Sequence, residues 1–313
     1  MLELYKTTGG GAHLSLHAIN LQNLKKYCQI LILLCCSTPS FAQTVTKTLL
    51  WEVRKPGNTN VSYLFGTFHY VSTKFFDALA IANSKLAQSD ILYVERAKQV
   101  SDESATSLKN EKWNPAKWKS YLSQAQDSIF KKFTSKSEDT SLYYYAPLAV
   151  SLNVHALYTK YFCEDDYSSL ELMDHHIESV ARKTNKKVFS LDTRQDDIIH
   201  AASNANSYSQ DSLLIAGCIR YMSNMLDENL EDCDIISKYK KFDIDYDFET
   251  DFTKSKSPSV LLIERNNLWI NILKKSFVKN NCFVAVGLRH LFYQQGLIQQ
   301  LRKLGFTVEP VFV

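Results

Sequence analysis

The chain has 313 residues, of which 45% are hydrophobic and 22% charged, and a formal net charge of +3 at pH 7. This balance is that of an ordinary globular protein with a sizeable core. Residues 1–42 contain Lys6, Lys25 and Lys26 against the single acid Glu3, so the remainder is close to neutral. Without a basic surplus or a long basic run, nucleic acid is excluded as an expected partner.

The N-terminus has the pattern of an export signal. Lys25 and Lys26 supply a positive n-region, residues 30–36 an apolar h-region, and Ser40-Phe41-Ala42 a small-x-small cleavage site. The apolar run is shorter than the roughly 20 residues that a membrane-spanning helix needs. We therefore expect cleavage after Ala42, a mature chain without a transmembrane span, and a periplasmic or secreted location in a bacterium.

Export would allow disulfide bonds between the cysteines that follow residue 42. These are Cys163, Cys218, Cys233 and Cys282. Four cysteines allow three pairings, and the sequence does not choose among them, although a bond between Cys218 and Cys233 would close a short helical loop. No CxxC or Cys/His spacing of a zinc site is present. As free thiols, the same residues would serve as small buried hydrophobic side chains.

The first predicted element after the signal is a β-hairpin. Residues 49–53 and 61–65 have strand character, and Pro56-Gly57-Asn58 between them has the composition of a turn. Apolar residues at helical spacing predict a helix over 75–86, and the β-rich run 91–94 follows it. A strand, a helix and a strand in this order predict a parallel strand pair.

The middle third of the chain is predicted to be the most helical. Residues 98–112 are polar and lack periodicity, which indicates a loop. Helical patterns follow from Pro115 to about Arg182, and 169–181 is clearly amphipathic. We therefore expect residues 98–185 to form a largely helical insertion or lid.

Strands and helices alternate again in the last third. The predicted strands are 187–191, 282–286 and 307–312, and the predicted helices are 210–226, 260–277 and 291–304. The acidic and aromatic stretch 242–252 fits neither pattern. Because no Pro/Gly/Ser-rich linker divides residues 43–313, the sequence predicts a single α/β domain, with a mixed, mostly parallel sheet flanked by helices.

Two of the predicted strands end in the same short motif. Gly66-Thr67-Phe68-His69 and Gly287-Leu288-Arg289-His290 both read GxxH, and Glu95 ends a third strand. In open α/β sheets, sites form outside the carboxyl ends of strands, where a glycine lets the backbone approach a ligand. Either histidine alone is better explained by a structural hydrogen bond, which is the more common role of a lone histidine at a strand end. Their equivalent positions at both ends of the chain favour a shared divalent-metal site or a site for acid–base chemistry.

Ordered blocks along the chain resemble the TraB/PrgY/GumN family, which includes the Tiki proteins. The resemblance spans residues 49–312 and covers nearly the whole mature chain. The blocks are LLWEV at 49–53, SYLFGTFH at 62–69, YVE at 93–95, LMD at 172–174, KVFSLDT at 187–193, ERNN at 264–267, FVAVGLRHL at 283–291, GL at 296–297 and LGFTV at 304–308.

This resemblance implies roles for four side chains. The family is marked by two GxxH motifs and a glutamate, so His69, Glu95 and His290 fall on its catalytic or metal-binding positions. Arg265 falls on the family's arginine, where it would bind a substrate carboxylate or hold Glu95 in place. The middle block of the family usually reads Leu-Glu-Thr. Here Asp192 is the shorter acid, so its catalytic use is in doubt, and a role in supporting other residues remains open.

The expected function is that of an exported metal-dependent hydrolase, with a peptidase favoured, because Tiki proteins are described as metal-dependent proteases. Its substrate would be a peptide or another small molecule. Histidine and carboxylate ligands favour Mn²⁺ or Co²⁺ and allow Zn²⁺, with Glu95 as either a ligand or the base. The alternative is a non-catalytic envelope protein that binds haem, a metal or a peptide signal in the same pocket, as ChaN-like relatives do. The oligomeric state stays open.

Other polar residues are weaker candidates. Asp174, His175, His176 and Glu178 lie on a predicted helix, and His175 and Glu178 share a face. Because adjacent residues of a helix point in different directions, a solvated helix face is the simpler interpretation. The isolated His155 and His200 are interpreted as structural, and the run 143–145 of three tyrosines as core or lid packing.

Overall fold

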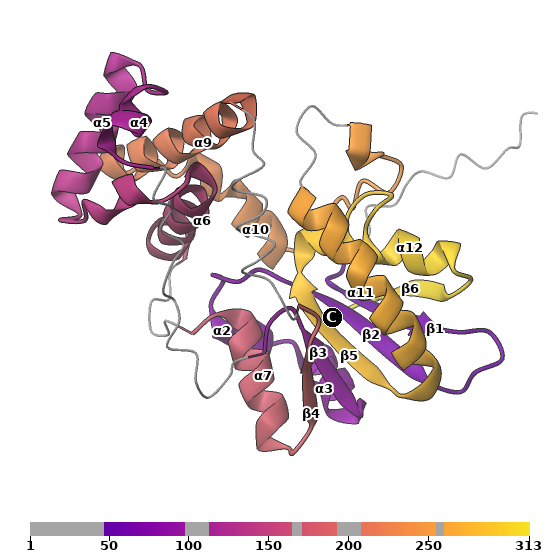
Figure 1. Ribbon diagram of the computed structural model, residues 1–313. Coiled ribbons are helices and arrows are strands. Elements are labelled where there is room, and N and C mark those ends of the chain that lie inside the picture. The colour runs from indigo at the N-terminus through magenta and orange to yellow at the C-terminus, as the bar shows by residue number, and fades with distance from the viewer. Residues whose placement is uncertain (1–46, 98–112, 165–170, 193–207, 255–259) are drawn as a thin grey trace, which may run out of the picture. The chain divides into compact units, whose positions relative to one another are not determined.

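The computed structural model describes residues 47–97, 113–164, 171–192, 208–254 and 260–313 (Figure 1). The predictions for residues 1–42, for the loop 98–112 and for His200 lie outside these ranges.

Within the described residues, six strands form one sheet in the order β4-β3-β5-β2-β1-β6. The four strands from β4 to β2 pair in parallel, whereas β1 runs antiparallel to both of its neighbours. The mixed, mostly parallel sheet predicted from the sequence is therefore confirmed. The strands are β1 (Leu50–Arg54), β2 (Val61–Thr67), β3 (Ile91–Val94), β4 (Lys187–Ser190), β5 (Cys282–Gly287) and β6 (Thr307–Val311).

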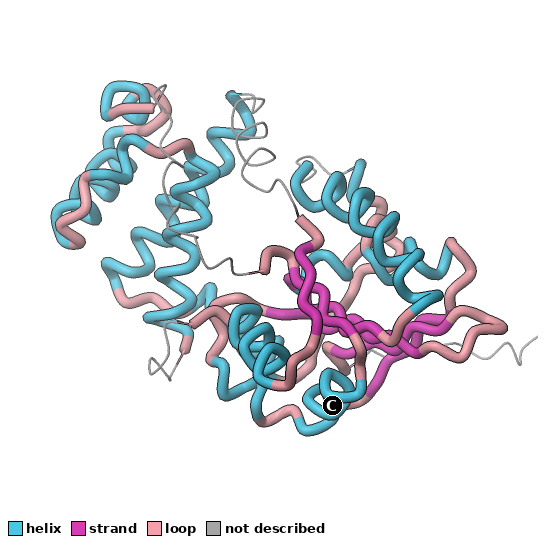
Figure 2. The backbone as a smooth tube through the Cα atoms, turned by 60° about the horizontal axis from the view of Figure 1, so that its bottom comes forward, coloured by secondary structure: helices cyan, strands magenta, loops and turns pink. Residues whose placement is uncertain are grey.

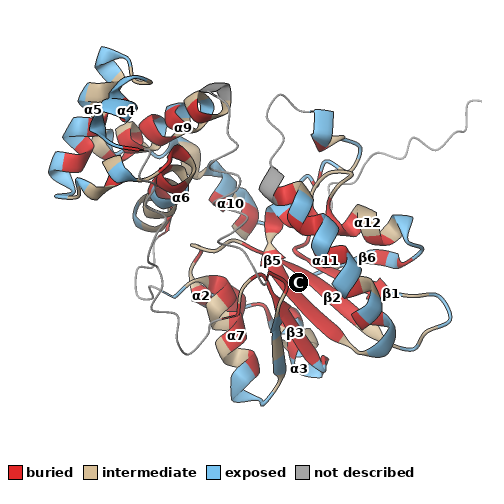
Figure 3. Ribbon diagram, in the orientation of Figure 1, coloured by how far each residue is buried: buried red, intermediate tan, exposed pale blue. Residues whose placement is uncertain are grey.

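Helices lie on both sides of this sheet (Figure 2). They are α2 (Thr73–Asp77), α3 (Ala80–Gln88), α7 (Met173–Lys183), α10 (Asp234–Lys240), α11 (Val260–Lys279) and α12 (Leu297–Lys303). Coverage on both faces explains why β3 and β5 are near-continuous apolar runs, since a central parallel strand has no face toward water. Their buried residues belong to the larger of two hydrophobic cores (Figure 3).

The second core belongs to helices of the middle of the chain. These are α4 (Pro115–Lys119), α5 (Gln124–Lys136), α6 (Pro147–Tyr158) and α9 (Tyr208–Asp227). Trp118, Phe130 and Met222 are among its fully or almost fully buried side chains. α9 lies beyond residue 185 in the sequence but packs against α6, whereas α7 packs against the sheet.

Two predicted helices differ from the observed ones. The helix expected over 75–86 is divided into α2 and α3, because the Asn83 amide donates hydrogen bonds to the carbonyls of Phe76 and Leu79 at the break. The helix expected over 291–304 begins only at Leu297. A 3₁₀ turn, η5 (Leu288–Leu291), precedes it, and Tyr293 has a left-handed backbone with φ 68°. The stretch 242–252 forms no strand, but it buries Tyr246, whose hydroxyl donates to Thr48 O.

In the described part of the chain, a disulfide joins Cys163 to Cys233. The pairing of Cys218 with Cys233 considered from their spacing is therefore wrong. Cys218 lies on α9 inside the helical core and Cys282 in the central strand β5, and both are free, buried thiols. The disulfide ties the π-helical turn η2 (Thr159–Cys163) to the short turn η3 (Glu231–Cys233), directly before α10.

The helices of the described part of the chain include none with the length and apolar character required to cross a membrane.

Candidate functional site

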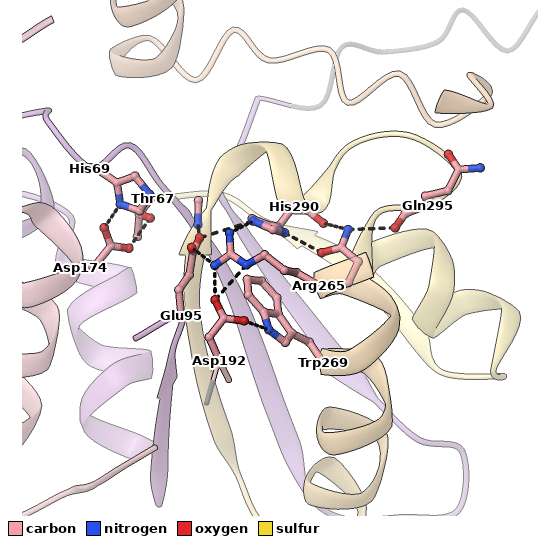
Figure 4. Close-up of polar contacts among 11 residues, drawn as sticks. Thr67, His69, Glu95, Asp174, Asp192, Arg265, Trp269, His290 and Gln295 are labelled. Carbon is pink, nitrogen blue, oxygen red and sulfur yellow. Dashed lines mark hydrogen bonds and ion pairs between the residues drawn. The ribbon is translucent and has the colours of Figure 1, made fainter. Parts of the chain in front are cut away.

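The sequence-predicted residues meet at the carboxyl ends of three neighbouring strands (Figure 4). His69 follows β2 by two residues, Glu95 follows β3 directly, and His290 lies in the turn after β5. Because β5 lies between β2 and β3, its own end is the point at which the three side chains converge.

Gly287 marks this point of convergence. A Cβ atom at residue 287 would lie 3.0 Å from Glu95 Oε1, 3.5 Å from His69 Nε2 and 3.8 Å from His290 Cδ2. Its φ of −50° is open to any residue, so the requirement here is for space and not for backbone freedom. The glycine of the second GxxH motif thus leaves room for three polar side chains at one place.

His69 is held through its Nδ1 atom by Asp174, whose other oxygen accepts a 2.6 Å hydrogen bond from Thr67 Oγ1. Burial by itself lowers the pKa of His69, but the adjacent carboxylate raises it to about 9. With 40% of the side chain exposed, the ring also reaches solvent. His69 is therefore a cationic, partly exposed imidazole in this arrangement, with Nε2 directed toward Glu95.

Asp174 is a site residue that the sequence analysis placed among the weaker candidates, on a helix face interpreted as solvated, and that interpretation is wrong for this residue. It lies in the first turn of α7, which is fixed beside the first GxxH motif by a hydrogen bond from Met173 N to His69 O. A signal for it existed, because Asp174 shares the buried face of this amphipathic helix with Ile177 and Ala181. A carboxylate on an apolar face needs a partner, and here the partner is a histidine.

Glu95 is buried and held by charge on several sides. Burial raises the pKa of its carboxyl, but Arg265 and the two histidines lower it far below its ordinary value. Arg265 Nη2 donates to Glu95 Oε2, and the backbone N–H of Gly287 donates to Oε1 at 2.6 Å. Glu95 is therefore an ionised carboxylate.

Arg265 is fixed in turn by Asp192. Its Nε and Nη2 atoms lie 2.9 Å and 2.6 Å from Asp192 Oδ2, and Trp269 Nε1 donates to Oδ1 at 2.6 Å. The Trp269 ring lies 4.5 Å below the guanidinium carbon. Of the two roles that the resemblance left open for Arg265, the geometry shows the one of holding Glu95. Asp192, the acid whose role was in doubt, supports the arginine.

His290 is held differently from His69. The Asn266 amide donates to two backbone carbonyls, those of His290 and Gln295, which turns Asn266 Oδ1 toward His290 Nδ1 at 2.7 Å. Nδ1 must then carry the proton, and Nε2 accepts from Arg265 Nη1 at 3.2 Å. Burial, with a further contribution from Arg265, lowers the pKa of His290 to about 3. This imidazole is neutral.

The weaker candidates do not gather into a second site. His176 contacts Asp77 and Glu171, and Glu178 pairs with Arg182, so these helix residues point to different partners. His155 packs between the rings of Phe68 and Tyr221. Of the three tyrosines at 143–145, Tyr143 and Tyr145 pack against the helical core, while Tyr144 is exposed.

A divalent ion would find suitable donors here. Both histidines have Nδ1 tied by a partner and Nε2 turned toward the centre of the site, which is the usual arrangement of histidine ligands. Arg265, however, lies against both Glu95 and Nε2 of His290. In the described ranges, no three His, Cys, Asp or Glu side chains stand in a metal-binding arrangement. An ion bound to His290 Nε2 would have to displace the guanidinium group of Arg265, which is planar and moves as a unit.

Comparison with known proteins adds one finding to this geometry. A family model described as the TraB/PrgY/gumN family matches residues 49–310, nearly the whole chain. Comparisons with curated proteins and with solved structures found no match.

Proposed function

The chain belongs to the TraB/PrgY/gumN family, and we propose that it is an exported metal-dependent hydrolase, specifically a peptidase, with its reaction centre beside Gly287. One observation carries the proposal. A Cβ atom placed on Gly287 would lie within 3.5 Å of both His69 Nε2 and Glu95 Oε1, and His290 is its next neighbour. The three side chains come from separate strands and have partners that fix their orientation. A purely structural role would not require this convergence.

His69, Glu95 and His290 are the residues that would hold the ion, for which nitrogen and carboxylate donors favour Mn²⁺ or Co²⁺ and allow Zn²⁺. A bound divalent ion would supply a water of lowered pKa for attack on a carbonyl carbon. Asp174 keeps the Nδ1 proton of His69 in place, so Nε2 is the atom that must lose its proton when the ring becomes a ligand. Ligand binding at neutral pH would thus release a proton from His69.

Arg265 would have two tasks. The guanidinium group is planar and moves as a unit, so an ion that takes His290 Nε2 would shift Nη1 together with the Nε and Nη2 atoms that contact Asp192. After this shift, Nη1 would donate to the negative charge that develops on the carbonyl oxygen under attack. Nη2 would keep Glu95 oriented toward the centre of the site.

The test combines metal content with peptide cleavage. The purified mature chain is expected to take up Mn²⁺ or Co²⁺ and to cleave peptides, to lose cleavage in a chelator, and to regain it when the ion is returned. His69→Ala and His290→Ala should lose both the ion and the cleavage. His175→Ala is the matched control, because this histidine lies on α7 outside the site and should change neither. Cleavage that persists in both site variants would refute the proposal.

The same experiment distinguishes the non-catalytic alternative. Uptake of an ion, or a haem absorption band, without any turnover would favour a binding protein that uses the same residues.

A further inference from the structure

Trp269 lies on α11 one turn after Arg265, inside the polar network of the site (Figure 4). Its side chain is fully buried, and its Nε1–H donates to Asp192 Oδ1 at 2.6 Å. The centre of its ring lies 4.5 Å from the guanidinium carbon of Arg265 and 4.3 Å from the centre of the His290 ring. One indole therefore contacts a carboxylate, a cation and an imidazole of the site.

Three residues of α11 together contact the ring of His290. Asn266 Oδ1 lies 2.7 Å from Nδ1, Arg265 Nη1 lies 3.2 Å from Nε2, and Trp269 packs against the ring itself. These three share one side of α11, because helical residues three and four apart are neighbours on the helix surface. The two polar contacts hold the edges of the imidazole, and the indole opposes rotation of its plane.

The Nε1 atom of Trp269 acts on Arg265 through Asp192. Asp192 Oδ2 accepts from both Nε and Nη2 of Arg265, and its other oxygen accepts from the indole. With both oxygens bound, the carboxylate cannot rotate without losing charge-assisted hydrogen bonds. The fixed carboxylate holds the guanidinium group in the orientation in which Nη2 also reaches Glu95. An apolar ring in place of the indole would fill the space but leave Asp192 Oδ1 without this donor.

Trp118 shows the arrangement of a packing tryptophan in the same chain. It is equally buried, in the helical core, and its Nε1–H donates to the backbone carbonyl of Tyr145 at 3.3 Å. Its ring packs against the rings of Trp113 and Phe130. The contacts of Trp269 differ, because they include a carboxylate, a guanidinium group and a candidate ligand of the ion. This difference indicates a role in placing these groups as well as in filling the core.

We propose that Trp269 is a positioning residue of the site, which holds Asp192 and Arg265 in place against Glu95 and fixes the ring plane of His290. A cation is attracted to the face of a tryptophan ring within about 6 Å of its centre, and this attraction is less directional than a hydrogen bond. The indole would therefore keep the guanidinium group in the site when it shifts away from His290. This consequence for catalysis rests on the proposed hydrolase function, whereas the placement of the groups does not.

The first experiment measures hydrogen exchange by NMR in the ion-free protein. Trp269→Phe keeps a ring beside Arg265 but removes the N–H group that Asp192 accepts. In this variant the Arg265 Nε–H is expected to exchange about tenfold faster than in the wild type, the factor that corresponds to one lost hydrogen bond to a charged group. Trp118→Phe is the matched control, because it removes an equally buried indole and its hydrogen bond outside the site. Unchanged exchange in Trp269→Phe, or the same increase in both variants, would overturn the proposal.

Trp269→Leu tests the ring face separately, because it removes the ring as well as the N–H group. The Nδ1–H of His290 should exchange several-fold faster in this variant, the scale of one aromatic pair, and should stay near its wild-type rate in Trp269→Phe. Equal exchange of this proton in the wild type and in Trp269→Leu would refute the role of the ring face. If Trp269→Leu does not fold, Trp269→Phe alone decides the proposal.

Peptide cleavage then relates the placement of Arg265 to catalysis. In Trp269→Phe, kcat is expected to fall about tenfold with KM nearly unchanged, because Arg265 acts on charge that develops during the attack. Trp118→Phe should keep the wild-type kcat. If the wild type cleaves no peptide, the hydrolase proposal fails, and the exchange of the Arg265 Nε–H still decides the role of Trp269. Faster exchange without a loss of kcat would overturn the catalytic consequence.

Discussion

The two GxxH motifs have the same spacing and lie at the ends of adjacent parallel strands, yet one histidine is cationic and the other is neutral. His69 contacts a carboxylate, is partly exposed, and has its pKa raised to about 9. His290 contacts the Asn266 amide, is buried beside Arg265, and has its pKa lowered to about 3. The motif therefore sets the position of each ring, whereas partners from other elements set its charge.

This difference gives the two rings separate tasks. His290 offers its Nε2 lone pair at any pH above its low pKa, whereas His69 must first lose a proton. In such a site, His290 is a neutral donor before an ion binds. Until the ion binds, the positive charge of His69 balances negative charge of Glu95 and Asp174. Four substitutions test how far the contrast depends on the named partners, and we give them from the largest expected effect to the smallest.

The largest effect is expected for Arg265→Ala, which removes the cation beside His290. Glu95 and Asp192 would stay buried without their counterion, at a cost of about 3–5 kcal/mol in the free energy of unfolding. Denaturant unfolding measures this loss. The pKa of His290 should rise, because Glu95 would then act on it without the opposing charge, and NMR titration of the ring reports the change.

Arg54→Ala is the control for Arg265. Arg54 pairs with Glu52 at the surface, so its loss should cost less than about 1 kcal/mol. Equal losses in the two variants would mean that the buried carboxylates do not depend on Arg265.

The next largest effect is expected for Asn266→Asp, which gives His290 the kind of partner that His69 has. The new carboxylate would raise the pKa of His290, and it could no longer donate to the carbonyls of His290 and Gln295. Each buried group left without a partner costs about 1–3 kcal/mol, so the variant should be clearly destabilised. If the pKa of His290 stays near its wild-type value by NMR, the amide is not what distinguishes the two rings.

Asp174→Asn makes the converse change at His69 and should cost about 1–2 kcal/mol, because one charge-assisted hydrogen bond is lost. In the wild type the folded-state pKa of His69, about 9, exceeds the value of about 6.5 for an unfolded histidine. The charged pair therefore contributes fully below about pH 6.5, and this stability is lost as the pH rises through about 9.

Unfolding measured in a chelator between pH 6 and 10 tests this sign. The wild type should lose stability over the upper part of that range, and Asp174→Asn should not. Parallel pH profiles of the two proteins would show that Asp174 does not set the charge of His69.

The sequence was sufficient for the sheet and for the place of the site. Apolar strand patterns and two glycines at strand ends are local signals, and they predicted that His69, Glu95 and His290 would meet. The partners were a different matter, because Asp174 lies 105 residues from His69 and no local pattern joins them. The helix predicted over 291–304 was given too early a start for a similar reason, since it begins only at Leu297. Gly296 is needed there because a Cβ would lie 2.2 Å from Phe292 O, a contact visible only in the folded chain.

The smallest effect is expected for Tyr239→Phe, which acts on the first motif alone. The buried Tyr239 hydroxyl donates to Gly66 O at 2.9 Å, and its ring packs against Phe68. Loss of this hydrogen bond should cost about 1 kcal/mol in unfolding free energy. Tyr246→Phe is the matched control, since the Tyr246 hydroxyl makes a similar buried bond to Thr48 O, which belongs to neither motif.

The disulfide provides a second way to test Tyr239, because α10 begins directly after Cys233. If the disulfide holds α10 so that Tyr239 can reach the first motif, removing both cysteines should already weaken that hydrogen bond. A double-mutant cycle between Cys163→Ser/Cys233→Ser and Tyr239→Phe should then be non-additive, whereas the cycle with Tyr246→Phe should be additive. Additive losses in both cycles would mean that the disulfide and Tyr239 act independently. In that case, the placement of α10 would not contribute to the difference in charge between His69 and His290.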